Sequence, residues 1–600
     1  MPEDWISGYL GGASLAARIL FDTLTPDLDP LSPDAPLLFL TGPLTGTSGP
    51  AVGRFVVAGR SPATGLWAES NCGGFWGPEL RKAGFDGLLI TGKSPRPVYL
   101  WVEDGKVSIR EAGHLWGRST VQVQEQIMAE LNRPGSRIAS IGPAGENLVN
   151  FALIHCDHGR VAGRTGLGSV MGAKNLKAIA VYGSGRPDIQ RPDEYNVIRR
   201  RSNRALRADT VSDLLRELGS AGGADYFDYL GEMPKKYFQR GEFPGAENIS
   251  GSSIAESILV GVSTCHACVI ACGRVVRLGE EPDRKGPEYE TLVGFGPNLW
   301  IDDPAVVTRL GELCDHLGLD SISMSNTIGL AYTLYEQGVI TDSDTEGFPL
   351  RWGDPSGVAE LIQQTASRTG FGDILADGAL ALARKFGREE EAVQVNGLEA
   401  AYHDPRGASG MGLVYATSPR GACHNQSDYH MVEIGQAEED LGLKYFSRHA
   451  GAEKSENVAR HQDWRTVCNS LVLCFFANVA PKTVLELVNA ACGFDLDLDG
   501  LMQIGERGWN LKRVINNRLG LRRSNDTLPK AFLRPYREGG AAGFKLDLPG
   551  MLEAYYAARG WDPDTGFPTR EKLDQLGLGW TVPYLCDGMQ PDSSQSAGAG

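Results

Sequence analysis

The sequence lacks the features that mark membrane, secreted and nucleic-acid-binding proteins. It contains no run of about 18 apolar residues, the length that a membrane-spanning helix needs. The first residues, MPEDWISGYLGG, show no basic stretch followed by an apolar one and so do not predict a secretory signal. The formal net charge of -16 argues against a surface that binds nucleic-acid phosphates. We therefore expect a cytoplasmic protein without a membrane or nucleic-acid partner.

Cysteine is scarce, with 11 in 600 residues, yet Cys265, Cys268 and Cys272 all lie within the segment CHACVIACG. In a reducing compartment such a cluster indicates metal binding or catalysis rather than disulfides. A zinc site would usually need a second pair of ligands nearby, and none follows. A [4Fe–4S] cluster needs four thiolates, and the fourth can lie far along the chain, so the C-x2-C-x3-C spacing favours an iron–sulfur cluster. The candidates for the fourth ligand are Cys314, Cys423, Cys468, Cys474, Cys492 and Cys586.

The chain is too long for one hydrophobic core, and its length predicts about three or four domains. Up to about residue 186, short segments rich in β-branched and aromatic residues predict strands, including a hairpin that turns at Asp104–Gly105. After that point, apolar residues recur with the helical period, and we find no internal repeat. We predict an α+β protein with a β-rich domain (1–186), two helical domains (187–394 and 395–586) and a disordered tail (587–600).

Several sequence blocks together resemble one family. They include GPLTGTSGPAVGRFVVAGRSPATG, SNCGGFWGPELRKAGFDGLLITGK, GRVAGRTGLGSVMGAKNLKAIAV, GPEYETL, DHLGLDSIS and DPRGASGMGLVYATSPRGACH. All are similar to the tungsten-containing aldehyde ferredoxin oxidoreductases, from about residue 8 to beyond residue 480. The resemblance implies a β-sheet base domain and two mostly helical domains. These would enclose a tungsten atom held by two pyranopterin dithiolenes, with a [4Fe–4S] cluster nearby.

The resemblance also identifies the fourth cluster ligand. In the family it ends a D-x-x-G-L-C motif, which here corresponds to NSLVLC and makes Cys474 the expected ligand. Asn469 replaces the usual Asp and Val472 the usual Gly, whereas Leu473 matches. An earlier D-x-x-G-L-D motif is intact as DHLGLD, and the family uses one motif for each pterin. The expected pterin residues in it are Asp315, Leu319 and Asp320.

The same resemblance implies that residues of the glycine-rich loops bind the cofactors. Arg54 corresponds to an arginine between cluster and pterin, and other residues correspond to pterin and phosphate contacts. These are Asn71, Gly73, Arg160, Gly163 and Arg164. Arginine binds phosphate groups with two parallel hydrogen bonds, and glycine lets backbone N–H groups come close to a ligand. A magnesium ion between the pterin phosphates would fit the same picture.

The family oxidises aldehydes to carboxylic acids and passes the electrons through the cluster to ferredoxin or a similar subunit. Its active-site glutamate corresponds to Glu290, and Glu288 would lie on the same face if GPEYETL is extended. For the family's histidine we prefer His424 over His430, with His403 as a weaker candidate. A histidine beside a glutamate in a closed cavity could relay protons.

Three questions stay open at the level of sequence. The family also includes the tungsten subunit of a benzoyl-CoA reductase, so the substrate could be an aromatic thioester rather than an aldehyde, or the chain could be a scaffold without tungsten. Molybdenum could replace tungsten, and the chain could form a homodimer or a hetero-oligomer. Family members usually begin with further residues that form early strands, so we also expect an upstream start.

Overall fold

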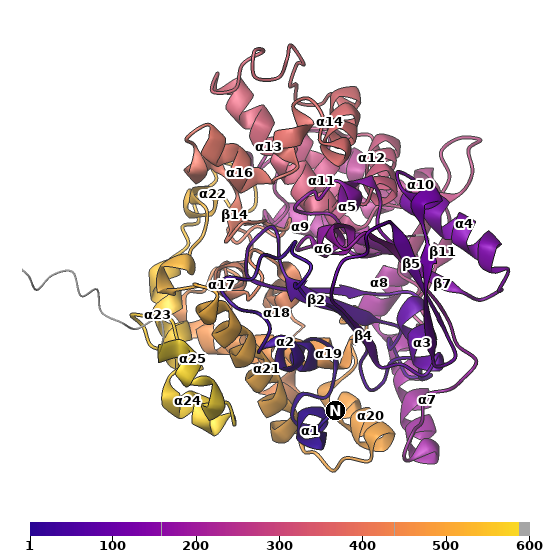
Figure 1. Ribbon diagram of the computed structural model, residues 1–600. Coiled ribbons are helices and arrows are strands. Elements are labelled where there is room, and N and C mark those ends of the chain that lie inside the picture. The colour runs from indigo at the N-terminus through magenta and orange to yellow at the C-terminus, as the bar shows by residue number, and fades with distance from the viewer. Residues whose placement is uncertain (158, 437, 587–600) are drawn as a thin grey trace, which may run out of the picture.

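The computed structural model describes residues 1–157, 159–436 and 438–586, and it combines a β-rich N-terminal part with a helical remainder (Figure 1). The expected disordered tail, 587–600, lies outside the described residues. The N-terminal strands are β1 Leu37–Leu40, β2 Phe55–Arg60, β3 Trp67–Cys72, β4 Gly87–Ile90, β5 Val98–Glu103, β6 Lys106–Glu111, β7 Arg137–Ser140, β8 Ile154–Cys156, β9 Arg160–Ala162 and β10 Leu176–Tyr182. The helices around them are α1 Glu3–Tyr9, α2 Gly12–Leu20, α3 Trp76–Lys82, α4 Thr120–Leu131, α5 Pro143–Glu146 and α6 Leu167–Ala173.

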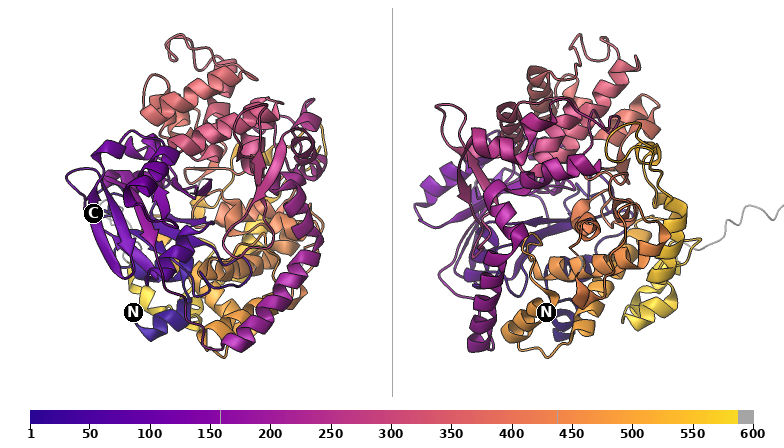
Figure 2. Two further views of the ribbon diagram at one scale, coloured as in Figure 1. Left: turned by 90° about the vertical axis from the view of Figure 1, so that its right-hand side faces the viewer. Right: turned by 180° about the vertical axis from the view of Figure 1, so that it is seen from behind.

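Helices dominate the rest of the chain, as the periodicity predicts (Figure 2). Those of the middle part are α7 Pro192–Ala208, α8 Thr210–Leu218, α9 Ala224–Leu230, α10 Gly251–Ser257, α11 Tyr289–Phe295, α12 Pro304–Leu317, α13 Ser321–Glu336, α14 Pro355–Ser367, α15 Gly372–Leu375 and α16 Ala379–Lys385. Those of the last part are α17 Gly410–Thr417, α18 Tyr429–Glu433, α19 Ser455–Leu471, α20 Pro481–Cys492, α21 Leu498–Arg518, α22 Lys530–Leu533, α23 Leu548–Arg559, α24 Arg570–Gln575 and α25 Pro583–Cys586. The remaining strands are β11 Leu259–Ser263, β12 Gly273–Val276, β13 Arg284–Lys285, β14 Gln394–Val395 and β15 Leu398–Glu399.

Two sheets face each other in the N-terminal part. One has the strand order β3-β2-β1-β4 and is antiparallel throughout, and the other has the order β6-β5-β10-β7-β8-β9. Along β1, Leu37 and Phe39 point into the core between the sheets, whereas Leu38 and Leu40 point to the opposite face. This alternation is the period-2 pattern of a strand buried on both faces. The predicted hairpin is confirmed, with β5 and β6 joined at Asp104–Gly105.

The outer face of the four-stranded sheet is covered by helices from both ends of the chain. Helix α2 and the late helix α21 pack together on Leu38, Leu40 and neighbouring strand residues (Figure 1). Lys512 of α21 forms a buried ion pair with Glu69 of β3, with 2.9 Å between Nζ and Oε2. The first helices therefore pack with the C-terminal part, although the sequence reading placed only strands in this region.

Two helices end in the same way, and both ends carry the pterin motifs named above. Gly318 follows helix α12 as its cap, and the N–H groups of Gly318 and Leu319 both donate to the Cys314 carbonyl, at 2.8 and 2.9 Å. Val472 follows helix α19 in the same way, and the N–H groups of Val472 and Leu473 both donate to the Cys468 carbonyl. The backbone φ is positive at both ends, 82° for Gly318 and 48° for Val472. The predicted correspondence of the two motifs thus extends to their backbone geometry.

Glycines of the N-terminal part touch both of these helix ends. A Cβ atom on Gly142, after β7, would lie 2.3 Å from the Leu317 carbonyl oxygen of α12. A Cβ on Gly42, after β1, would lie 2.3 Å from the Leu471 carbonyl oxygen of α19. Each glycine is followed by a proline and comes directly after a strand and one linking residue. This local correspondence escapes a search for sequence repeats because it is confined to two Gly–Pro pairs.

Candidate active site and cluster site

The four predicted cluster cysteines come together although about 200 residues separate Cys474 from the other three. Cys268, Cys272 and Cys474 pack against one apolar group that includes Ala51. The N–H of Cys474 donates to the Ala51 carbonyl at 3.2 Å, which ties the end of α19 to the first glycine-rich loop. The Cys265 thiol interacts electrostatically with the Cys474 thiol. The four thiols therefore belong to one site.

Two half-buried arginines, Arg54 and Arg160, lie beside the thiols. A Cβ atom on Gly73 would lie 3.0 Å from Cys265 Sγ and 3.1 Å from Arg54 Nη1, so the absence of a side chain lets the two groups approach. Burial raises the pKa of the Cys265 thiol, while Arg160 and Arg54 act in the opposite direction. Arg54 is held by Asn71, whose Oδ1 accepts from Nε at 2.5 Å. The arginines favour the thiolate form that iron binding requires.

Glu288 and Glu290 do not lie on the same face, because the segment is helical rather than extended. Glu288 precedes α11 and accepts from Ser220 Oγ at 2.5 Å, close to Cys272. Glu290 lies in the first turn of α11, and its Oε2 accepts from the Tyr402 N–H at 2.9 Å. The extended conformation in which the two carboxylates would share a face is not adopted, because helix α11 begins at Tyr289 and places Glu290 in its first turn. Glu288 thus belongs to the cluster side and Glu290 to a separate buried site.

A group of histidines surrounds Glu290. His403 Nε2 lies 3.6 Å and His424 Nδ1 lies 3.7 Å from Glu290 Oε1, and this oxygen has no hydrogen-bond partner among the described residues. Burial raises the pKa of Glu290 to about 8 and lowers the pKa of His424 well below its ordinary value. His403, which the sequence reading ranked as the weaker candidate, is as close to Glu290 as the preferred His424.

His430 does not reach Glu290 but belongs to a second layer behind it. Its ring stacks on that of His403 at 4.0 Å, and its Nδ1 lies 4.0 Å from Glu232 Oε1. His403 Nδ1 contacts the same Glu232 oxygen at 2.6 Å. Burial raises the pKa of Glu232 to about 7 and lowers the pKa of His403 to about 3 and of His430 to about 4. Glu232, in YLGEMPKK, carried no signal that sequence reasoning could have used.

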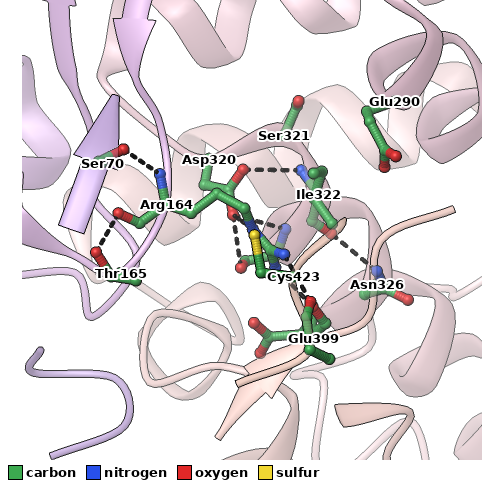
Figure 3. A network of polar contacts seen from close by, with 12 residues as sticks. Ser70, Arg164, Thr165, Glu290, Asp320, Ser321, Ile322, Asn326, Glu399 and Cys423 are labelled. Atoms are coloured by element: carbon green, nitrogen blue, oxygen red, sulfur yellow. Dashed lines mark hydrogen bonds and ion pairs between the residues drawn. The ribbon is translucent and has the colours of Figure 1, made fainter. Parts of the chain in front are cut away.

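Arg164 joins three parts of the chain beside this acid–base group (Figure 3). Its guanidinium donates to Asp320 Oδ2 at 3.1 Å, to the Glu399 carbonyl at 2.6 Å and to the Ala422 carbonyl at 3.0 Å. Asp320 in turn caps α13 by accepting from the N–H groups of Ile322 and Ser323, each at 3.2 Å. Both charges are buried, with side chains 5% exposed. Their pairing offsets the cost of burying two charges and joins the β-rich part to the helical part at this point.

Of the two other predicted pterin residues of the first motif, Leu319 is buried in the hydrophobic core and Asp315 forms a separate ion pair. Asp315 pairs with Lys285, with 2.8 Å between Oδ2 and Nζ, and it does not contact Arg164. Together with Glu288 and His155 these residues line a cavity of about 200 Å³. Asn469 is buried in α19, and its backbone carbonyl oxygen would lie 2.2 Å from a Cβ atom added to Gly12. A Cβ atom added to Gly163 would lie 3.5 Å from Val161, so among the described residues Gly163 has no tight contact.

Comparisons with known proteins settle the family. The model for the N-terminal domain of aldehyde ferredoxin oxidoreductase matches residues 1–183, and the model for its domains 2 and 3 matches residues 197–578. The chain belongs to the aldehyde ferredoxin oxidoreductase family. The tungsten-containing aldehyde ferredoxin oxidoreductase of Pyrococcus furiosus is 40% identical over 584 residues, which cover 96% of this chain and 95% of that protein. The corresponding protein of Thermococcus kodakarensis is 39% identical with the same coverage.

Two more distant similarities are to proteins whose names give other activities. The WOR-like subunit of an aliphatic sulfonate oxidoreductase from Pyrococcus furiosus is 29% identical, covering 84% of this chain and 82% of that protein. A chain of the active-site complex BamBC of benzoyl-coenzyme A reductase, solved with 1,5-dienoyl-CoA, superposes with a TM-score of 0.85 at 25% identity. That match covers 100% of this chain and 96% of the solved chain. Among the described helices, none has the length and hydrophobicity of a membrane span.

Proposed function

We propose that this family member oxidises aldehydes to carboxylic acids with a bis-pyranopterin tungsten or molybdenum centre and passes the electrons through a [4Fe–4S] cluster to ferredoxin or a ferredoxin-like subunit. The names of the relatives with 39–40% identity support the substrate class and the metal. The observation that carries the proposal is the meeting of Cys474 with the Cys265–Cys272 segment beside Arg54 and Arg160. We propose the domains 1–186, 187–394 and 395–586 as the three units around this centre.

The residues present fit these cofactors. The four cysteines would supply the four thiolates of a cubane, and the half-buried Arg54 and Arg160 and the buried Arg164 suit anionic groups. When bound, the metal and its pterins would accept the two electrons of the oxidation, which no side chain of this site can do. We propose that the pterins, with Mg²⁺ between their phosphates, contact residues of both motifs and the glycine-rich loops. These are Arg54, Asn71, Gly73, Arg160, Gly163, Arg164, Asp315, Leu319, Asp320, Asn469 and Leu473.

Glu290 is the proposed base of the reaction. Conversion of a hydrated aldehyde to a carboxylic acid removes two electrons and two protons, so the site needs a group that accepts protons. Glu290 Oε1 is buried and has no hydrogen-bond partner among the described residues, whereas Oε2 is fixed by the Tyr402 N–H. Its pKa of about 8 suits proton transfer near neutral pH. His424, whose Nδ1 likewise has no hydrogen-bond partner among the described residues, would orient the substrate oxygen beside Glu290.

We propose that His403 and Glu232 take part in the same proton transfer as Glu290. An imidazole can accept a proton on one nitrogen and release one from the other. His403 presents Nε2 to Glu290 at 3.6 Å and Nδ1 to Glu232 at 2.6 Å, so it connects the two carboxyl groups. Protons taken up by Glu290 would pass through His403 to Glu232, which restores Glu290 for the next turnover.

The experiment that tests the proposed function is anaerobic purification of the protein followed by metal analysis and a viologen-reduction assay. The panel should contain aliphatic and aromatic aldehydes. We expect tungsten or molybdenum together with about four iron atoms per chain, and aldehyde-dependent reduction of the viologen. Iron without either pterin metal would instead identify a scaffold that has kept only its cluster.

The alternative is an aryl-thioester substrate, as in the benzoyl-CoA reductase complex that the fold matches. By resemblance that branch uses a cysteine near the metal, whereas the first motif here ends in Asp320, with Cys314 close by in the sequence. A different cysteine, Cys423, lies next to Arg164 (Figure 3). Arg420 Nη2 donates to Cys423 Sγ at 2.6 Å, which would suit a thiolate. Activity with aryl-CoA thioesters and none with aldehydes would favour this second function.

A further inference from the structure

The edge of the cluster site reaches the protein surface. The thiols of Cys265, Cys268, Cys272 and Cys474 are each half-buried rather than fully enclosed. Around them, the loop residues Thr264 and Ala267 are exposed, and Val262 of β11 and Phe476 after the fourth cysteine are 52% and 38% exposed. Exposed apolar side chains next to a redox centre form a small surface on which a partner could exclude water.

A basic stripe runs towards this surface along α7. Residues 199–207, RRRSNRALR, contain five arginines and no acidic residue, in a chain whose net charge is -16. Arg200, Arg204 and Arg207 are exposed, and their spacing of four and three residues places them on one face of the helix. None of these three has an ion-pair partner within 4.0 Å among the described residues. A solvated helix face would usually mix both charges, so this stripe is unusual for an acidic protein.

The fold ties the stripe to the cluster segment. Leu206, between Arg204 and Arg207, belongs to the apolar group against which Cys268, Cys272 and Cys474 pack. Helix α8, which follows α7 directly, is fixed to the same segment by Arg274. This arginine donates to the carbonyls of Glu217 and Ala271, each at 2.7 Å. Figures 1 and 2 show α7 as a long helix on the outside of the molecule.

We propose that the exposed face of α7 and the apolar rim around Cys268 form the docking surface for a small, acidic, one-electron carrier protein. The inference rests on the proposed function, since it requires a cluster that passes electrons on singly. A positive patch next to the exit point attracts an acidic partner and speeds the encounter, whereas the apolar rim provides close contact. A neutral or basic carrier would gain nothing from the arginines of α7.

The test measures electron transfer from the cluster without using an aldehyde. Holoenzyme is reduced with dithionite and mixed in stopped flow with an oxidised acidic ferredoxin or with benzyl viologen, while the visible absorbance of the cluster is followed. The variant carries Arg200→Glu, Arg204→Glu and Arg207→Glu. The matched control carries Lys93→Glu, Arg96→Glu and Lys106→Glu, which are exposed and change the net charge equally. Lys106 begins β6, at the edge of the six-stranded sheet opposite to β9 and its Arg160.

We expect the second-order rate constant with ferredoxin to fall at least tenfold in the α7 variant at about 20 mM salt, and less at about 300 mM, where screening is stronger. Reduction of benzyl viologen should stay within twofold for all proteins. Equal ferredoxin rates in wild type and α7 variant, or an equal loss in the control, would overturn the docking surface. A chain without cluster absorbance would overturn it too. Failure of every aldehyde in the viologen assay would contradict the proposed function while leaving this measurement intact.

Discussion

Glu290→Gln should change the pH dependence of the enzyme as well as its rate. The amide keeps the size and the hydrogen bond from the Tyr402 N–H but can no longer accept a proton at Oε1. A missing general base typically costs about 10²–10⁴-fold in rate. In the wild type, the catalytically useful form is the ionised carboxylate, so activity should rise with pH until the group is fully ionised.

The size of the pKa shift of Glu290 follows from the burial of its carboxyl group. Burial raises the pKa of Glu290 from its ordinary value of 4.5 to about 8, partly offset by the Tyr402 N–H and by Arg164. At about 1.4 kcal/mol per tenfold change, this corresponds to roughly 5 kcal/mol against the charged form. At pH 7 about one tenth of the carboxyl groups would be ionised. The folded state also binds this proton more tightly than the unfolded chain, so Glu290 lowers stability as pH rises from 4.5 towards 8.

The assay is viologen reduction with a saturating aldehyde and with a limiting one, between about pH 5.5 and pH 9.5. Wild-type kcat/KM should rise about tenfold per pH unit and level off near pH 8. Glu290→Gln should be slow and nearly independent of pH over this range. Glu288→Gln, two positions earlier on the cluster side, should keep the wild-type profile. If kcat/KM of Glu290→Gln rose with pH and levelled off near pH 8 as in the wild type, the assignment of Glu290 as the base would be refuted.

Three further changes test the surroundings of the site. Glu232→Gln should leave the KM for substrate unchanged but lower kcat and make kcat depend more steeply on buffer concentration, because the proton relay would end at His403. An unchanged kcat in dilute buffer would exclude the relay. Arg164→Lys keeps the charge but cannot make all three hydrogen bonds, so it should cost about 3 kcal/mol and lower the tungsten or molybdenum content, as thermal unfolding and metal analysis would show. Gly42→Ala places a Cβ against the end of α19 and should cost about 1–3 kcal/mol in unfolding free energy, whereas Gly113→Ala, which has open space, should cost little.

The sequence was sufficient for the elements whose pattern is local. The strands at Leu37–Leu40 and Phe55–Arg60 lie where segments rich in β-branched and aromatic residues predict strands, and the helix at Pro304–Leu317 lies where the helical period predicts helices. Within the region of helical periodicity, α7 and α8 are separate helices that meet at Asp209, because the Asp209 side chain caps α8 and competes with continuation of α7. The packing of α21 on the N-terminal sheet joins residues about 450 positions apart, and a local sequence pattern cannot predict such a contact.

The candidate site also contains some residues that the sequence could predict and others that it could not. The spacing of three cysteines is enough to predict a metal site at Cys265, Cys268 and Cys272. The fourth ligand, Cys474, could be chosen only through the family resemblance. The helical state of GPEYETL separated Glu288 from Glu290, which the alternation of a strand would have kept together. Glu232 could not be found, because a lone glutamate is typical of a solvated surface until the fold buries it.

Iron analysis of Cys474→Ser tests the central claim most directly, namely that a cysteine far along the chain completes the cluster site. The protein is purified anaerobically beside Cys492→Ser, a half-buried cysteine at the end of α20. We expect about four iron atoms per chain and the signal of a reduced [4Fe–4S] cluster in the wild type and in Cys492→Ser. Cys474→Ser should lose iron and lack the wild-type signal in electron paramagnetic resonance. Full iron content and an unchanged spectrum in Cys474→Ser would contradict the account.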